Sequence, residues 1–229
     1  MDSITNFLGA LPIWAVPVLL AITFHEAAHG YVAYWLGDDT AKRAGRLSFN
    51  PIAHIDLFGT VILPLLLLYM GGFIFGYAKP VPVNPNNLRK PRRDMVLVAA
   101  AGPGANIVLA IAGALMMPLA LVLPEFLGIW LSKNIANLIL LNCLLAVLNM
   151  LPLPPLDGGK VAHGLLPPHL ARRYGRIAPY GIFILVGIVF ILPMLGRPLG
   201  LNLNIGRYLI FEPSYALANW ILTTFGIGV

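Results

Sequence analysis

Residues 11–36 read LPIWAVPVLLAITFHEAAHGYVAYWL, a long apolar run that contains the motif His25-Glu26-Ala27-Ala28-His29. Side chains four positions apart share one face of a helix, so His25 and His29 can bind one metal ion from the same side. Glu26 points about 100° around the helix, where it can reach a metal-bound water. Histidine and glutamate are costly in hydrocarbon and mark a functional site there. The run therefore predicts a zinc hydrolase site inside a membrane-embedded helix.

The composition excludes an ordinary soluble domain. The 229 residues are 59% hydrophobic and 10% charged, with a mean hydropathy of +0.82, whereas a soluble domain carries about 25% charged residues. We expect one membrane-embedded domain over residues 1–229, with a catalytic core near 11–170 and C-terminal helices near 178–225. The single Cys143 cannot form an intrachain disulfide. The N-terminus has neither the basic region nor the cleavage site of a removable signal peptide.

Six apolar segments predict an all-α polytopic membrane protein with about five to six transmembrane segments. The second segment is unusual because it contains Pro64 and the pair Gly71-Gly72, which do not suit a regular spanning helix. Non-helical backbone is tolerated at membrane depth where it lines a cavity, so we expect residues 57–77 to be re-entrant. The six segments are Leu11–Leu36, Leu57–Tyr77, Met95–Leu123, Asn134–Leu151, Ala178–Leu195 and Tyr208–Phe225.

The distribution of lysine and arginine among the loops favours this re-entrant arrangement. The loops at 37–56, 78–94 and 152–177 hold three, five and four basic residues, and the loop at 124–133 holds one. Six simple spans would divide these residues nine to four, whereas a re-entrant second segment divides them twelve to one. The positive-inside rule prefers the second division, with the three basic loops in the cytoplasm. The net charge of +6 suits an anionic membrane surface, and no soluble face is available for nucleic acid.

The two histidines need a third ligand, because catalytic zinc usually has three protein ligands and keeps its fourth position for water. Asp157 stands out because it lies in a proline-rich stretch, NMLPLPPLDGG at residues 149–159, that ends the fourth apolar segment. The prolines forbid a regular helix and the glycines let the backbone turn sharply, so the carboxylate can fold back towards His25. The alternative is that Asp157 only caps a helix over 158–166. The other candidate ligands are His54, His163, His169, Asp56 and Glu212.

Together these motifs resemble the site-2 protease family of intramembrane zinc metalloproteases. The resemblance rests on HEAAH at 25–29, on NMLPLPPLDGG at 149–159 and on AGPGAN at 101–106, which is similar to the family's Gly-Pro-x-x-Asn element. The stretches NPIAHIDLFGT at 50–60 and GYAKPVPVNP at 76–85 resemble the compact bacterial and archaeal branch without appended PDZ or CBS domains. Leu57 departs from that branch, where proline commonly follows the aspartate. The matches cover about residues 15–170, and the C-terminal third carries no motif that we can match.

The resemblance implies a role for each main residue of the site. His25, His29 and Asp157 would hold one Zn²⁺ per chain, and Glu26 would be the general base. Bound zinc lowers the pKa of water from 15.7 towards about 7 and polarises the scissile carbonyl. Glu26 would take the water proton and later deliver it to the leaving amine.

Three further residues have two interpretations each. Asn149 would hydrogen-bond the substrate backbone or the oxyanion, or else contact a neighbouring helix. Asn106 is either an accessory group of the site or a brace between closely packed helices. His54 either reaches into the site or is bonded to Asp56 or to the backbone of its own loop.

The resemblance implies that the substrate is a transmembrane helix of another protein in the inner membrane of a prokaryote. Such a helix must unwind before its backbone can be cut, which proline, glycine or asparagine in the substrate would ease. The run Pro80-Val81-Pro82-Val83 could pair with an unwound substrate by strand addition. The oligomeric state and the identity of the substrate do not follow from the sequence.

Three rival interpretations stay open. A metal-binding transporter or scaffold is the alternative from another class, although neither needs Glu26 beside a ligand and no repeated halves are visible. A catalytically silent relative would lack Glu26 or a ligand. An unrelated membrane zincin would take its third ligand from a later glutamate, and Glu125 and Glu212 are poorly placed for that.

Overall fold

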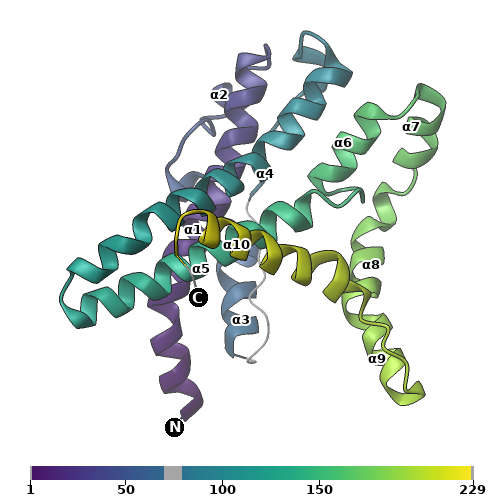
Figure 1. Ribbon diagram of the computed structural model, residues 1–229. Coiled ribbons are helices and arrows are strands. Elements are labelled where there is room, and N and C mark those ends of the chain that lie inside the picture. Colours follow the sequence, from purple (N-terminus) through teal and green to yellow (C-terminus); the bar gives the residue numbers. More distant parts are fainter. Residues whose placement is uncertain (1, 70–78, 228–229) are drawn as a thin grey trace.

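The computed structural model describes residues 2–69 and 79–227, and within these ranges every regular element is a helix or a helical turn (Figure 1). The predicted all-α fold is therefore confirmed. Five helices build the part of the molecule that carries the site. They are α1 (Asp2–Trp35), α4 (Pro91–Met116), α5 (Glu125–Asn149), α6 (Asp157–Leu165) and α10 (Glu212–Thr224).

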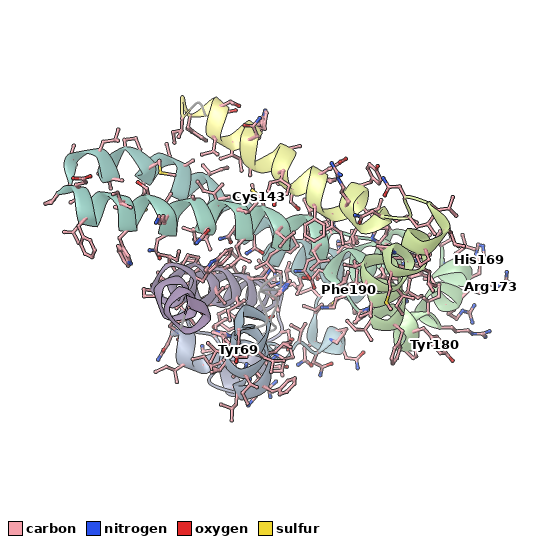
Figure 2. All side chains as sticks on the ribbon, turned by 90° about the horizontal axis from the view of Figure 1, so that it is seen from below. Tyr69, Cys143, His169, Arg173, Tyr180 and Phe190 are labelled. Carbon is pink, nitrogen blue, oxygen red and sulfur yellow. The ribbon has the colours of Figure 1, made fainter. Side chains whose placement is uncertain are left out.

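The centre of the fold is the mutual packing of α1, α4 and α5, with α6 against α4 and α10 across α5 (Figure 1). Small side chains allow α4 and α5 to approach closely: a Cβ added at Gly113 would lie 3.1 Å from Cγ1 of Ile139. Figure 2 labels Cys143 on α5, which belongs to the same apolar core. The buried members of this core are Ala110, Ala114, Ile135, Ile139, Cys143, Ala218 and Ile221.

Shorter elements connect these helices. The short α-helices are α2 (Thr40–Arg43), α3 (Leu63–Tyr69), α7 (Pro168–Gly175), α8 (Gly181–Val186) and α9 (Leu192–Gly196). Single turns of 3₁₀ helix lie at Pro51–Ala53, Pro85–Asn87, Met117–Val122, Ala178–Tyr180 and Arg197–Leu199. Turns of π-helix lie at Leu57–Ile62, Gly187–Ile191 and Arg207–Phe211.

Among the residues that the structure describes, three helical runs are long and apolar enough to cross a membrane, namely Pro91–Val122, Glu125–Asn149 and Pro168–Gly196. The chain is thus a membrane protein, and the total of five to six spans stays a prediction. Figure 1 shows α2, the first turns of α4 and the α6–α7 turn at one end of the bundle. Parts of the three basic loops therefore lie at one end of the molecule, and their shared position in the cytoplasm stays a prediction.

One expected loop is wrong: residues 124–133 are not a loop, because α5 begins at Glu125. A hydropathy window ends the apolar segment at the polar residues Ser132, Lys133 and Asn134. Ser132 and Asn134 nevertheless fit a helix, since each side chain donates to the carbonyl four residues earlier, at 2.8 and 3.0 Å. At this end of α5 the helix therefore begins nine residues before the predicted apolar segment.

The segment expected to be re-entrant, 57–77, is described as far as Tyr69, and residues 70–78 lie outside the described ranges. Its two flanks meet, because the backbone N–H of Lys79 donates to the carbonyl of His54 at 3.0 Å. A segment that crossed the bilayer once would separate these atoms by about 30 Å. The described residues on either side of this segment, His54 and Lys79, therefore lie at the same level, and the re-entrant course of 57–77 stays a prediction.

The linker between α5 and α6 folds back over the first turn of α6. A Cβ added at Gly158 would lie 2.3 Å from the carbonyl oxygen of Met150, and one added at Gly159 would lie 2.5 Å from the nitrogen of Pro154. Neither glycine has a positive φ. The two glycines are thus required for close backbone approach, and not for the sharp turn that the sequence suggested. This packing fixes Asp157 at the first residue of α6.

Candidate metal centre

Three side chains from distant parts of the sequence meet at one point of the bundle. Nε2 of His25, Nε2 of His29 and Oδ2 of Asp157 lie 3.1 Å from one another in each pairing. All three residues are buried, with exposed fractions of 8%, 8% and 4%. The structure thus brings together the two histidines of α1 and the aspartate that the sequence singled out, across 132 and 128 residues of chain.

Hydrogen bonds on the far side of each imidazole define which nitrogen carries the proton. Nδ1 of His29 lies 2.6 Å from the carbonyl oxygen of Val98, which can only accept, so Nδ1 donates. Nδ1 of His25 lies 2.6 Å from Oδ1 of Asn106 and donates to it. In the neutral imidazoles both Nε2 atoms therefore present lone pairs towards Asp157.

The orientation of the Asn106 amide is itself fixed by its neighbours. Nδ2 of Asn106 donates to Oδ1 of Asn142 at 2.7 Å and to the carbonyl of Ala21 at 3.3 Å. Nδ2 of Asn142 in turn donates to the carbonyl of Leu138 at 2.8 Å. Because both carbonyls only accept, Oδ1 of Asn106 is left to face His25. A chain of hydrogen bonds from α5 through α4 thus holds one metal ligand on α1.

The donor set fits a zinc ion. Zinc with tetrahedral geometry and bonds of about 2.0–2.1 Å holds its ligand atoms about 3.3 Å apart, close to the observed 3.1 Å. Two lone pairs and a carboxylate oxygen at this spacing repel one another unless a cation lies among them. His25, His29 and Asp157 are thus three ligands of a kind that a catalytic zinc site uses.

The second carboxylate oxygen of Asp157 is bound by a residue that the sequence analysis missed. Nζ of Lys160 lies 2.9 Å from Oδ1 of Asp157, one helical turn further along α6. Burial alone would raise the pKa of Asp157, and the positive charge of Lys160 acts against burial and lowers it. With Oδ1 bound to Lys160, the carboxylate offers Oδ2 to the metal position. The i,i+3 spacing of Asp157 and Lys160 could have indicated this pair.

Glu26 lies next to the ligands and is held by a loop. Its Oε2 accepts a hydrogen bond of 2.7 Å from the backbone N–H of Val81. Residues 79–84, which we call the strap, carry Val81 and have no regular structure. The sequence suggested a strand-like run here, and the structure adds that its central N–H binds Glu26.

Both ends of the strap are tied down. At its start, His54 binds Lys79 through the backbone, and Nη2 of Arg46 donates to the Lys79 carbonyl at 2.6 Å. At its end, the buried Asp38 accepts from the backbone N–H of Asn84 at 2.7 Å. Asp38 also binds Thr40 and Asn87, so it joins the end of α1 to the loop that follows the strap. The position of the N–H that binds Glu26 is thus set by residues outside the motif.

A cavity of about 330 Å³ opens on the metal position. Its wall includes Glu26, the strap residues Val81 and Val83, Asn149 and Lys160. Asn149 donates to the carbonyl of Leu145 at 3.1 Å and lies at the end of α5. The cavity is large enough for a short peptide segment, and the charged groups in its wall surround the metal position.

Gly102 on α4 is a second residue whose role the sequence analysis missed. A Cβ added there would lie 2.4 Å from Nε2 of His29 and 2.7 Å from Cε1 of His25. Any side chain at this position would displace a ligand. Gly102 precedes Pro103 in the AGPGAN motif. The motif therefore singled out this part of α4, but it did not show that a side chain at Gly102 would collide with His29.

The other candidate residues lie away from the metal position. His54 is fully buried, and its Nε2 donates to the carbonyl of Ser48 at 2.7 Å, outside the metal cavity. Asp56 caps the following helical turn through the N–H of Gly59, and Glu212 pairs with Arg207 at 3.0 Å. His163 lines a neighbouring cavity. His169 lies on the outer side of α7, as Figure 2 shows.

Comparison with known proteins gives the family. The chain is 39% identical over 212 residues to "Putative zinc metalloprotease YwhC" of Bacillus subtilis, a match that covers 87% of this chain and 90% of that protein. It belongs to this family of zinc metalloproteases. It is also 32% identical over 197 residues to "Putative zinc metalloprotease Rip2" of Mycolicibacterium smegmatis, covering 84% of this chain and 71% of that protein. No family model matches the chain, and no solved structure matches it.

Proposed function

We propose that this chain is a zinc endopeptidase that hydrolyses a peptide bond within or near the transmembrane helices of membrane protein substrates. One observation carries the proposal: the buried triangle of His25, His29 and Asp157 lies on helices of a membrane protein, next to the carboxylate of Glu26. The family membership supports hydrolysis of peptide bonds, and the resemblance to site-2 proteases supports hydrolysis inside the membrane.

Each catalytic residue has its own role in the proposed reaction. His25, His29 and Asp157 would hold the zinc ion, which would supply Lewis-acid polarisation of the scissile carbonyl and acidify water. Glu26 accepts the proton of the attacking water and returns it to the nitrogen of the leaving amine. The N–H of Val81 orients the carboxylate of Glu26 and leaves its second oxygen free for this proton. Asn149, in the wall of the cavity, hydrogen-bonds the substrate backbone or the developing oxyanion.

We propose that the site lies within the bilayer. We place the protein in the inner membrane of a prokaryote as one multi-pass domain, with the three basic loops in the cytoplasm and segment 57–77 re-entrant. The backbone contact between His54 and Lys79 supports the re-entrant arrangement. The substrate helix must unwind to expose its backbone, and the strap offers an extended edge near Glu26 for the unwound chain.

Cleavage mapping in liposomes tests this function. The purified protein is reconstituted with a single-span substrate that carries a fluorescent tag, and the products are identified by mass spectrometry. We expect cuts within or near the apolar span and none in a soluble unfolded protein such as casein. Cleavage of casein alone would contradict the intramembrane assignment. Zinc movement into the liposomes without cleavage would favour the rival transporter.

A further inference from the structure

A second cavity lies beside the metal cavity and has no part in the function described so far. Its volume is about 280 Å³, and it opens between the start of α4, the proline-rich linker, α6 and α7. Lys160 is the only lysine or arginine in its wall. The remaining wall is largely apolar and includes Met95, Pro154, Pro155, Tyr174 and Ala178.

The second cavity adjoins the metal cavity, because Met95, Pro155 and Lys160 line both. Helix α6 runs from one to the other: Asp157 lines the metal cavity and His163 lines the second one. Six helical residues rise about 9 Å, and an extended peptide advances about 3.3 Å per residue. The second cavity is therefore one to three peptide residues away from a bond that is cut at the metal position.

We propose that the second cavity is a specificity pocket, which receives an aliphatic or aromatic side chain of the substrate one to three residues from the scissile bond. The proposal rests on the proposed function. It gives α7, in the part of the chain without a recognisable motif, a direct role in substrate selection.

Size and charge define the side chain that fits. A dry apolar cavity of about 150 Å³ already admits benzene, so about 280 Å³ holds a leucine or phenylalanine side chain. A charged substrate side chain would lose its hydration here without gaining an oppositely charged partner, because Lys160 is already paired with Asp157 and the other polar groups of the wall belong to His163 and Tyr174. An unwound transmembrane segment is rich in apolar side chains, and such side chains suit this wall.

The outer wall of the pocket is held in place by a close contact. A Cβ added at Gly181, at the start of α8, would lie 1.4 Å from the carbonyl oxygen of Pro154. The chain after α7 thus packs directly against the linker that leads to Asp157. This contact holds α7 and the wall residues Tyr174 and Gly175 at a fixed distance from α6.

Gly175 offers a direct way to fill the pocket. A Cβ added there would meet His163 at 3.8 Å, which is ordinary contact, so a side chain can begin at this position without a backbone clash. The test variant is Gly175→Val, with Gly175→Ala as a milder version. The matched control is Gly187→Val, because a Cβ added at Gly187 meets nothing within 4 Å.

The experiment measures kcat/KM for a series of transmembrane substrates in liposomes. Each of the three positions on either side of the mapped bond is changed in turn to alanine, leucine, phenylalanine or aspartate. We expect the wild type to prefer leucine or phenylalanine over alanine by about 10-fold or more at one position. Gly175→Val removes most of that preference, Gly175→Ala reduces it, and Gly187→Val keeps it.

Two results would contradict the proposal that the second cavity is a specificity pocket. One is a wild type without an apolar preference at any of the six positions, and the other is an unchanged preference in both Gly175 variants. Failure of the proposed function would give a different result. The wild type would then cut no member of the series, and the specificity pocket would be rejected together with the function. A ratio between substrates is insensitive to the amount of folded enzyme, so poor folding does not imitate the expected result.

Discussion

A single methyl group on α4 should abolish zinc binding. In Gly102→Ala the new Cβ would lie 2.4 Å from Nε2 of His29, and ordinary contact begins at 3.4 Å. The ligating nitrogen must therefore retreat by about 1 Å, whereas zinc–ligand distances tolerate about 0.2 Å. Loss of a group that merely supports a ligand costs about 10–100-fold in metal affinity. We expect the displaced ligand to cost more than about 100-fold, which is roughly 2.7 kcal/mol.

The control for this variant is two residues away on the same helix. A Cβ added at Gly104 meets nothing within 4 Å, so Gly104→Ala should bind zinc like the wild type. Alanine is the better helix former by about 1 kcal/mol at both positions, so neither change should unfold α4. Zinc affinity is measured by competition with a chromophoric chelator in detergent, and helicity by circular dichroism. Gly102→Ala with wild-type zinc affinity would refute the geometry assigned to the two histidines.

Three further predictions concern the surroundings of the site. Asn106→Leu removes the acceptor from Nδ1 of His25 and should weaken zinc binding about 10–100-fold, as measured by chelator competition. The control is Asn137→Leu on α5, whose amide donates to the Ile13 carbonyl and which should leave zinc binding unchanged. Lys160→Met removes a half-exposed ammonium from the buried carboxylate of Asp157, and because solvent screens that ammonium the zinc affinity should fall by less than about 10-fold. A larger loss would show that the lysine does more than neutralise charge. Burial alone would raise the pKa of Asp38, but its hydrogen bonds hold that pKa below the usual range, so its stabilisation is present above about pH 4 and is lost as the pH falls further. Asp38→Asn should accordingly lower the melting temperature at pH 7 and flatten its decline in acid, and parallel acid curves for the two proteins would contradict this.

The sequence was sufficient for the helical fold and for the residues that meet at the metal position. His25 and His29 are local, since one helix sets their spacing, and the apolar flanks indicate the membrane. Asp157 could be predicted because prolines break the helix just before it and two glycines follow it, although the glycines are needed for close backbone contact with Met150 and Pro154. Helix ends were less predictable, as at Glu125, because apolar content and helix formation differ there.

Most of the contacts that hold the site could not be predicted, because they join distant segments, even where a residue such as Asn106 was already a candidate. Asn106 and Asn142 are both helical asparagines, and only the packing of α4 on α5 makes them one chain of hydrogen bonds. The bond between Glu26 and Val81 joins residues 55 positions apart and involves a backbone group, which leaves no trace in the sequence. Gly102 is one small residue among many until its distance to His29 is known.

The most direct test of the account combines metal content and cleavage for the wild type and Glu26→Gln. Both proteins are purified in parallel, their zinc is measured by atomic emission, and both are given the same fluorescent transmembrane substrate in liposomes. The account predicts about one zinc per chain in each, because Glu26 is not a ligand, and chelator-sensitive cleavage by the wild type alone. Cleavage by Glu26→Gln at the wild-type rate would contradict the assignment of the base and, with it, the mechanism.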